Sequence, residues 1–211
     1  MTPDSTTRQR LSKSDRREVI ERAASELFAK RGYAATTLEQ VATAAGVSRP
    51  LLYKHFSSKR ELHLTLLAQH RDALLKRLAD GLGQPGPLAE RMPRVADSWF
   101  AYVEENPFAW FMLFRDTTGD PEIQAFYREM QATARNGLAA LIRAEPELDL
   151  PEERIEPTAE FFRSAMTGLA LWWAEHPTVS RTLVVDVVVG AMSEGLRLSG
   201  GGQAAGTRSA H

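Results

Sequence analysis

The 211-residue sequence contains no cysteine, so disulfide bonds and thiolate chemistry are excluded. No stretch is apolar for long enough to cross a bilayer, and the N-terminus has no apolar signal-peptide core. We therefore expect a cytoplasmic protein without a membrane partner. The remaining composition, with 43% hydrophobic and 25% charged residues, is ordinary for a globular protein and supplies ample material for a core.

The patterns of several catalytic and metal sites are also missing. No His has a Glu three residues before or after it, as a di-iron helical bundle requires, and there is no phosphate loop or zinc pattern. His63 and His70 lie seven residues apart, about 10 Å along a helix, which is too far for one metal ion. We expect no catalytic residue, no metal and no other cofactor. An enzyme built on a helical bundle is the weaker alternative.

The formal net charge of -1 hides an asymmetry along the chain. Residues 1–60 hold twelve Lys and Arg against six Asp and Glu, whereas the remainder holds fourteen against twenty-one. A basic N-terminal part on an acidic remainder is typical of a DNA-binding module joined to a module with another task. Two solvated surfaces that differ by chance are the alternative.

The chain is organised around the stretch from Thr37 to Phe56. Thr37 is placed to cap a helix whose apolar positions follow at helical spacing, and these are Leu38, Val41, Ala42 and Ala45. Gly46 ends this helix because glycine reaches a left-handed backbone at little cost, and Ser48 begins a second, short helix. A helix, a glycine turn and a capped second helix form a helix-turn-helix, whose second helix enters the DNA major groove.

Residues 26–67, ELFAKRGYAATTLEQVATAAGVSRPLLYKHFSSKRELHLTLL, resemble the N-terminal domain of the TetR family of bacterial transcription regulators. The resemblance covers about the first third of the chain. It implies a dimeric, all-helical regulator with a ligand-binding C-terminal domain. Against the family pattern, Pro50 stands where a glycine or another small residue is more common, and Leu51 stands where Thr or Ala is common.

The recognition helix and its neighbours supply the expected DNA contacts. Arg49 has the geometry for guanine O6 and N7, and Leu51 can touch only a thymine methyl group. Cations near the helix suit phosphates, and so does a hydroxyl at a helix N-terminus. The resemblance implies that the Tyr53 hydroxyl meets a phosphate. The expected DNA-contacting residues are Thr36, Thr37, Ser48, Arg49, Pro50, Leu51, Tyr53, Lys54, His55 and Lys59.

The rest of the chain predicts further helices and an all-α fold. The run from Leu183 to Val189 is β-branched and reads locally as a strand, but it has no partner strand and continues at helical spacing, so we predict helix. The expected organisation is a disordered arm over residues 1–13, a helix-turn-helix domain over 14–60, a ligand-binding and dimerisation domain over 61–198, and a disordered tail over 199–211. The basic arm suits DNA phosphates, and a solvated tail is the alternative.

Aromatic and Met side chains gather between residues 99 and 130. Core packing explains part of them, and an apolar effector pocket, which the TetR resemblance places in this region, explains the rest. The candidate pocket residues are Trp99, Tyr102, Trp110, Phe111, Phe114, Phe126, Tyr127 and Met130.

The last two helices combine small residues with large apolar ones. Such a pair suits a two-fold interface, and in the TetR family it forms a four-helix bundle across the dimer; an intramolecular core is the alternative. The candidate interface residues are Ala165, Gly168, Leu169, Trp172, Val188, Ala191 and Gly195.

Together these features predict a ligand-responsive transcription regulator, most simply a repressor, that binds a palindromic operator as a homodimer. A small, largely apolar effector would release it from double-stranded DNA. An architectural DNA-binding protein without an effector is the alternative within the same class.

Overall fold

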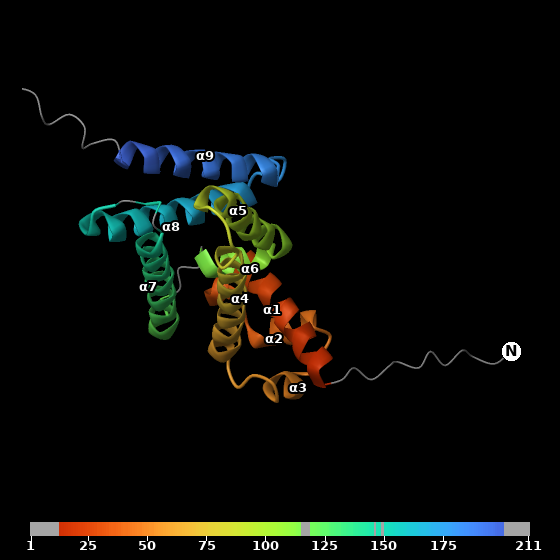
Figure 1. Ribbon diagram of the computed structural model, residues 1–211. Coiled ribbons are helices and arrows are strands. Elements are labelled where there is room, and N and C mark those ends of the chain that lie inside the picture. Colours follow the sequence, from red (N-terminus) through yellow and green to blue (C-terminus); the bar gives the residue numbers. More distant parts are fainter. Residues whose placement is uncertain (1–12, 115–118, 146, 149, 201–211) are drawn as a thin grey trace, which may run out of the picture.

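In the computed structural model, the described residues are 13–114, 119–145, 147–148 and 150–200, and they form nine helices and no strand (Figure 1). The helices are α1 Lys13–Ala35, α2 Leu38–Ala44, α3 Arg49–Tyr53, α4 Lys59–Leu82, α5 Leu88–Glu105, α6 Pro107–Phe114, α7 Pro121–Ala144, α8 Glu152–Ala174 and α9 Arg181–Gly200. The all-α prediction is confirmed for this part of the chain. Helix covers one residue of the predicted arm and two of the predicted tail, and the rest of both lies outside the described residues.

Helices α1, α2 and α3 form what we call the head, at one end of the molecule (Figure 1). Regular helical geometry in α1 stops at Gly32, which has a φ of 77°, in the left-handed region that glycine tolerates. The turn at Gly32 directs the chain into α2, which lies across α1.

The head shares one hydrophobic core with α4, α6 and α7. Phe28 of α1 and Leu52 of α3 belong to the same buried cluster as Met112 and Leu113 of α6, and all four are at most 2% exposed. Helix α4 runs through the predicted domain boundary at residues 60 and 61. The head is thus continuous with the rest of the fold.

Helices α5 to α9 form what we call the body, which has its own apolar cluster around Phe100, Trp110, Trp173 and Val184. The β-branched run is part of α9, as predicted, because Val184 and its neighbours at helical spacing pack into this cluster. Within the described helices, none is both long and apolar enough to cross a membrane.

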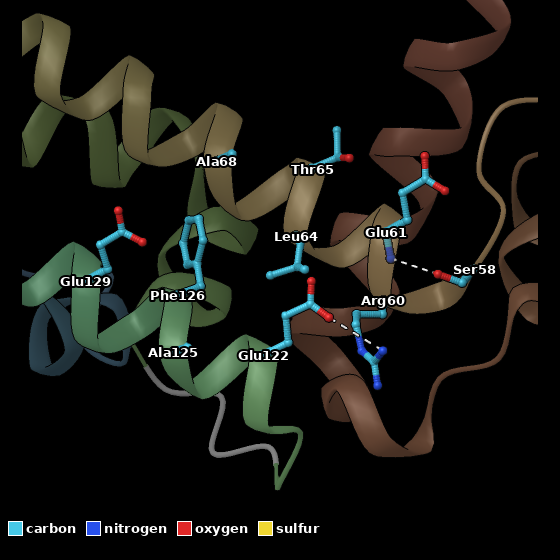
Figure 2. A pocket seen from close by; sticks show the side chains of 10 residues that line it. All are labelled: Ser58, Arg60, Glu61, Leu64, Thr65, Ala68, Glu122, Ala125, Phe126 and Glu129. Atoms are coloured by element: carbon cyan, nitrogen blue, oxygen red, sulfur yellow. Dashed lines mark hydrogen bonds and ion pairs between the residues drawn. The ribbon is translucent and has the colours of Figure 1, made fainter.

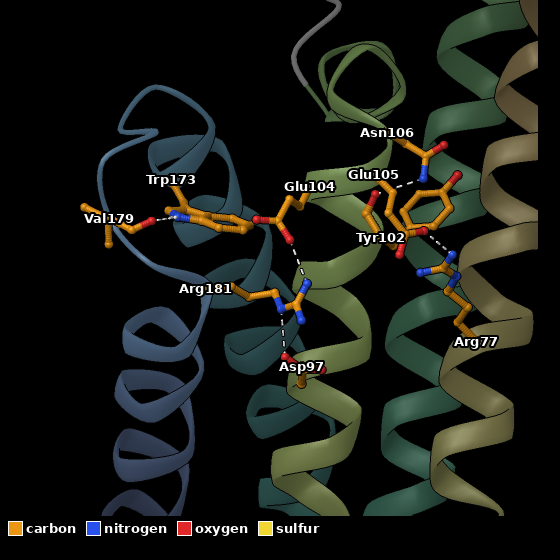
Figure 3. Close-up of polar contacts among 9 residues, drawn as sticks. All are labelled: Arg77, Asp97, Tyr102, Glu104, Glu105, Asn106, Trp173, Val179 and Arg181. Atoms are coloured by element: carbon orange, nitrogen blue, oxygen red, sulfur yellow. Dashed lines mark hydrogen bonds and ion pairs between the residues drawn. The ribbon is translucent and has the colours of Figure 1, made fainter.

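Ion pairs fasten the helices of the body to one another (Figure 3). The Arg181 guanidinium at the start of α9 donates to Asp97 at 2.8 Å and to Glu104 at 2.6 Å, both on α5. Arg77 of α4 pairs with Glu105, also on α5. Helix α5 is therefore held on both sides, and α8 and α9 lie at the end of the molecule opposite α3 (Figure 1).

Candidate functional site

The turn between α2 and α3 has the geometry that its sequence predicts. Thr37 accepts a hydrogen bond from the Gln40 backbone at 3.3 Å, and its own backbone N–H donates to the Gln40 side chain at 3.0 Å. This reciprocal pair is a capping box. Gly46 has a φ of 64°, and the Val47 N–H then bonds back to Ala42 O at 3.0 Å. The angle between the two helices is therefore fixed by local hydrogen bonds.

Helix α3 presents polar and cationic side chains outward. Leu52 and Phe56 are buried and hold the helix on the head. Arg49, Pro50 and Lys54 are exposed, and Tyr53 is 49% exposed. Ser48 occupies the N-cap position, but its side chain makes no capping bond. Leu51 and His55 are half-buried.

Arg49 forms an ion pair with Glu39 in the first turn of α2. Both side chains are well exposed, at 61% and 43%, so water screens the pair and its contribution to stability is small. The pair nevertheless holds the guanidinium at the N-terminal end of α3. Sequence reasoning missed this partner because Glu39 lies ten residues from Arg49, beyond the reach of a local pattern.

The prediction that the Thr36 side chain contacts a phosphate is wrong. Thr36 is fully buried, and its hydroxyl donates within the protein, at 2.9 Å to Gly32 O and 3.3 Å to Leu27 O. It secures the end of α1, where the chain leaves the helix. Thr37, the next residue, is exposed and stays a candidate.

Lys59 is less available to DNA than its charge indicates. Its ammonium group donates to Tyr33 O at 2.7 Å and lies 4.3 Å from the centroid of the Tyr33 ring. Lys59 therefore ties the start of α4 to the end of α1. The prediction of a phosphate contact here stays a proposal, in which Lys59 would serve DNA and the fold together.

His63 of α4 is fully buried, next to the end of α1 that Lys59 contacts. Its ring lies 4.7 Å from the centroid of Phe28 and 4.9 Å from that of Tyr33. Burial, with a smaller effect from the Lys59 charge, lowers the pKa of His63 to about 4. His63 of α4 is therefore a neutral buried residue at pH 7, packed against Phe28 and Tyr33 of the head. Within the described ranges, no three His, Asp or Glu side chains lie close enough to hold a metal ion.

An open groove between α4 and α7, with a volume of about 710 Å³, was not foreseen from the sequence (Figure 2). Leu64 and Phe126 supply apolar surface, and Glu122 and Glu129 lie along the α7 side. Arg60 spans one end and donates to Asp120, the N-cap of α7, at 2.8 Å. Helices α4 and α7 are about sixty residues apart in the chain, so no local pattern signals this groove.

Three of the predicted pocket aromatics come together in the body. Trp99 of α5 and Trp110 of α6 pack edge to face, with ring centroids 5.2 Å apart, and Phe114 lies 4.1 Å from Trp110. Tyr102 belongs to the same cluster, but its hydroxyl hydrogen bonds to His70 of α4 at 2.8 Å. Tyr102 therefore braces two helices.

The other predicted pocket residues do not join this group. Phe126 lines the open groove instead, and Met130 is buried in the core shared with the head. Tyr127 donates its hydroxyl to Met112 O at 2.5 Å and so links α7 to α6. Phe111 is half-buried on α6. A single pocket lined by all eight residues is therefore wrong.

The predicted interface positions divide between the surface and the core. Ala165, Gly168, Trp172 and Ala191 are exposed, whereas Val188 is 7% exposed in the body core, which corrects its assignment to an interface. Leu169 packs partly against the same core, and the exposure of Gly195 lies outside the description. Exposed apolar residues that the prediction missed are Phe161 and Leu183, with Val187 beside them.

Comparison with known proteins bears on both ends of the molecule. The sequence model of a family described as "Bacterial regulatory proteins, tetR family" matches residues 20–66. The chain is 31% identical over 147 residues to the "HTH-type transcriptional activator FasR" of Mycolicibacterium smegmatis, a match that spans 69% of this chain and 67% of that relative.

Solved structures share the fold over nearly the whole chain. A TetR-like transcriptional regulator from Rhodococcus sp. RHA1 has a TM-score of 0.75 and 22% identity, covering 89% of this chain and 99% of that one. The fatty acid degradation regulator FadR from Bacillus halodurans also has a TM-score of 0.75, at 16% identity, covering 86% and 96%.

Proposed function

Because the chain belongs to the TetR family and is a DNA-binding transcription regulator, we propose that it binds a near-palindromic operator as a homodimer and is released by a small, largely apolar effector. The observation that carries this proposal is the outward face of α3, where Arg49, Tyr53 and Lys54 are exposed. These side chains follow a turn that Gly46 and the Val47 N–H to Ala42 O bond define.

On DNA, α3 would lie in the major groove with its N-terminal end at the bases. Arg49 would leave Glu39 and donate to guanine O6 and N7, which is the commonest specific contact. Leu51, half-buried, has room only for a thymine methyl group. Ser48, Thr37 and Tyr53 would donate to phosphates, together with Lys54, His55 and Lys59, which fix the register without reading sequence.

The exposed apolar faces of α8 and α9 support a two-fold dimer. Phe161 is 66% exposed and Trp172 is 45% exposed, and Ala165 and Gly168 lie between them at helical spacing. On α9, Leu183 and Val187 are both 54% exposed and one turn apart. Several large apolar side chains exposed on the same helix faces indicate an interaction site. A second copy would cover it with the same surface.

The distance from α3 to this face gives the dimer its geometry. Helices α8 and α9 lie at the end of the molecule opposite α3 (Figure 1), so in the proposed dimer a change in the body would alter the separation of the two recognition helices. Two such helices read half-sites about 34 Å apart. An effector that favours another separation would shift the population away from DNA.

The core shared by α1 and α6 is a physical route for this coupling. Met112 and Leu113 of α6 pack against the head, and Trp110 and Phe114 of the same short helix pack in or against the body cluster. An effector that binds in the body and displaces α6 would therefore also move Met112 and Leu113, against which α1 packs. Coupling energies of about 1–3 kcal/mol are typical for such systems.

We propose repression as the direction of regulation, since release by an effector then permits transcription. The relative from Mycolicibacterium smegmatis is named an activator, so activation is the second candidate. In vitro transcription from a promoter that carries the selected operator separates them: added protein lowers the transcript yield in the first case and raises it in the second.

The decisive experiment is selection of bound sequences from random duplex DNA by the purified protein. We expect enrichment of a two-fold symmetric site, and Arg49→Ala to lose about 1–3 kcal/mol on that site while binding scrambled duplexes nearly as well as the unaltered protein. Failure to enrich any sequence would favour the architectural alternative. Equal losses on both duplexes would remove Arg49 from base recognition.

A further inference from the structure

Two indole N–H groups are buried side by side in the body without a hydrogen-bond partner among the described residues. They are the Nε1 atoms of Trp99 on α5 and Trp110 on α6. Trp110 is fully buried, at 0% exposed. Its ring centroid lies 5.2 Å from that of Trp99, and the rings are inclined at 82°. Adjacent helices therefore bring two indoles with unpartnered N–H groups into contact.

Trp173, in the same cluster, differs from Trp99 and Trp110 because its indole N–H has a hydrogen-bond acceptor. Trp173 lies in the same cluster, and its Nε1 donates to Val179 O at 2.8 Å (Figure 3). Buried polar groups are nearly always hydrogen-bonded, and each exception calls for an explanation. Phenylalanine at either position would fill similar space without an unpaired donor.

The ring arrangement does not satisfy both donors. In an edge-to-face pair, only one ring can point its edge at the face of the other, so an N–H to ring contact accounts for one donor at most. At least one indole N–H is then left without a hydrogen-bond acceptor, in a cluster against which Phe114 and the half-buried Met166 also pack.

We propose that Trp99 and Trp110 bind the carbonyl oxygen of a neutral, otherwise apolar effector, and this rests on the proposed function. Indole donates but cannot accept a hydrogen bond, so the ligand must bring an acceptor. The two donors carry no formal charge, and an apolar cluster strongly disfavours an ionised carboxylate. A ketone, ester or amide therefore fits better than an acid, with its apolar part against Phe114.

The test uses the full-length protein, labelled with ¹⁵N at its four tryptophans. Trp99→Phe and Trp110→Phe assign two of the four indole resonances. The probes are phenyl ketones of increasing alkyl length, beginning with acetophenone. Each is paired with the alkene in which a methylene replaces the oxygen, such as α-methylstyrene. Benzoate serves as the charged acceptor.

We expect a ketone to shift the Trp99 and Trp110 indole protons downfield and to leave Trp173, which already donates to Val179, in place. The ketone should bind roughly tenfold more tightly than its alkene, as one hydrogen bond predicts. Trp99→Phe combined with Trp110→Phe should remove that advantage without changing the affinity for the alkene. Phe126→Leu, in the open groove, is the matched control and should leave both affinities unchanged.

Three outcomes would overturn the proposal. They are equal affinities for ketone and alkene, no movement of either indole resonance up to the solubility limit of every ketone, and tighter binding of benzoate than of acetophenone. Fluorescence anisotropy on the selected operator separates this inference from the proposed function. Release from DNA without movement of the indole resonances would sink only the tryptophan assignment, whereas absence of any selected operator would sink the proposed regulator function itself.

Discussion

The two ends of this molecule expose opposite kinds of surface. At the head, α3 leaves Arg49, Lys54 and half of Tyr53 in solvent. At the far end of the body, the largest exposed side chains are apolar and include Phe161 and Leu183. The two surfaces differ in the free energy of their exposure to water. Cations are well hydrated, whereas exposed apolar area is unfavourable until something covers it.

The comparison indicates which contacts are permanent. Covering the apolar end, as the proposed second copy would, is favoured by the hydrophobic effect, so that contact should persist. The basic end gains by releasing counterions from DNA, an effect that falls steeply with salt. In the proposed dimer, the protein contact would therefore be lasting and the nucleic acid contact reversible.

The largest effect should come from placing charge on the apolar end. Leu183→Lys with Val187→Lys would bury like charges at the proposed two-fold contact, and we expect a monomer by analytical ultracentrifugation. A monomer reads only one half-site, so operator binding should weaken roughly 100- to 1000-fold. Ala73→Lys, at an exposed position of α4, is the matched control and should leave the mass unchanged. A dimeric double variant would show that the copies meet elsewhere.

The second effect is a loss of folding stability at acid pH, caused by the buried His63 of α4. The folded-state pKa of His63 is about 4, below the ordinary 6.5, chiefly because of burial. Between these values the unfolded chain binds more protons, so the free energy of unfolding falls as pH is lowered from 6.5 towards 4. The neighbouring Lys59 charge acts in the same direction, and Asp120 opposes it.

We expect this to remove up to about 3 kcal/mol of stability across the window. Urea unfolding at a series of pH values measures the decline. His63→Leu, which cannot titrate, should flatten the curve between pH 6.5 and 4 relative to the unaltered chain. Parallel curves for both proteins would assign the decline to other groups.

A smaller effect should follow from Lys54→Ala on the exposed side of α3. Operator and scrambled duplexes should lose affinity alike, by about threefold to tenfold, and the slope of log K against log salt should decrease by roughly 0.9 for each phosphate that is no longer neutralised. Titrations at several salt concentrations provide the slope. A weakening confined to the operator would instead make Lys54 a base contact. Lys59 is a poorer probe because it also binds Tyr33 O.

The smallest predicted effect is an increase in DNA affinity. Glu39→Gln removes the partner of Arg49 and one negative charge near the DNA, so affinity should rise by at most about fivefold, in keeping with an exposed ion pair. Glu26→Gln removes the exposed partner of Lys30 on α1 and is the matched control. Unchanged binding by Glu39→Gln would mean that Arg49 exchanges partners without cost.

Local chemistry made the head predictable from sequence. Thr37 caps α2 through Gln40, three positions away, and Gly46 turns the chain because glycine tolerates a positive φ. Both features can therefore be predicted from a few consecutive residues. Thr36 was misassigned because its hydroxyl bonds to Leu27 O, nine residues back across the bend at Gly32. A cap and a buried anchor look alike in sequence when they are adjacent threonines.

The body was predictable only as a set of helices. Aromatic spacing assigned Phe126 and Trp110 to one pocket, yet α7 turns the first to an open groove and α6 buries the second. Val188 and Val187 are neighbours of the same type, and only tertiary packing decides that one faces the core and the other solvent. Interhelical placement depends on contacts between distant segments, which periodicity does not encode.

The buried seam between α1 and α6 has a consequence for engineering. Consider a chimera that takes residues 1–60 of this chain and the rest of another regulator. Phe28 and its neighbours would then lack Met112 and Leu113, so an apolar side of the transplanted DNA-binding head would be exposed to solvent. Exchange of specificity should carry α6 along, or should confine the graft to the few solvent-facing positions of α3.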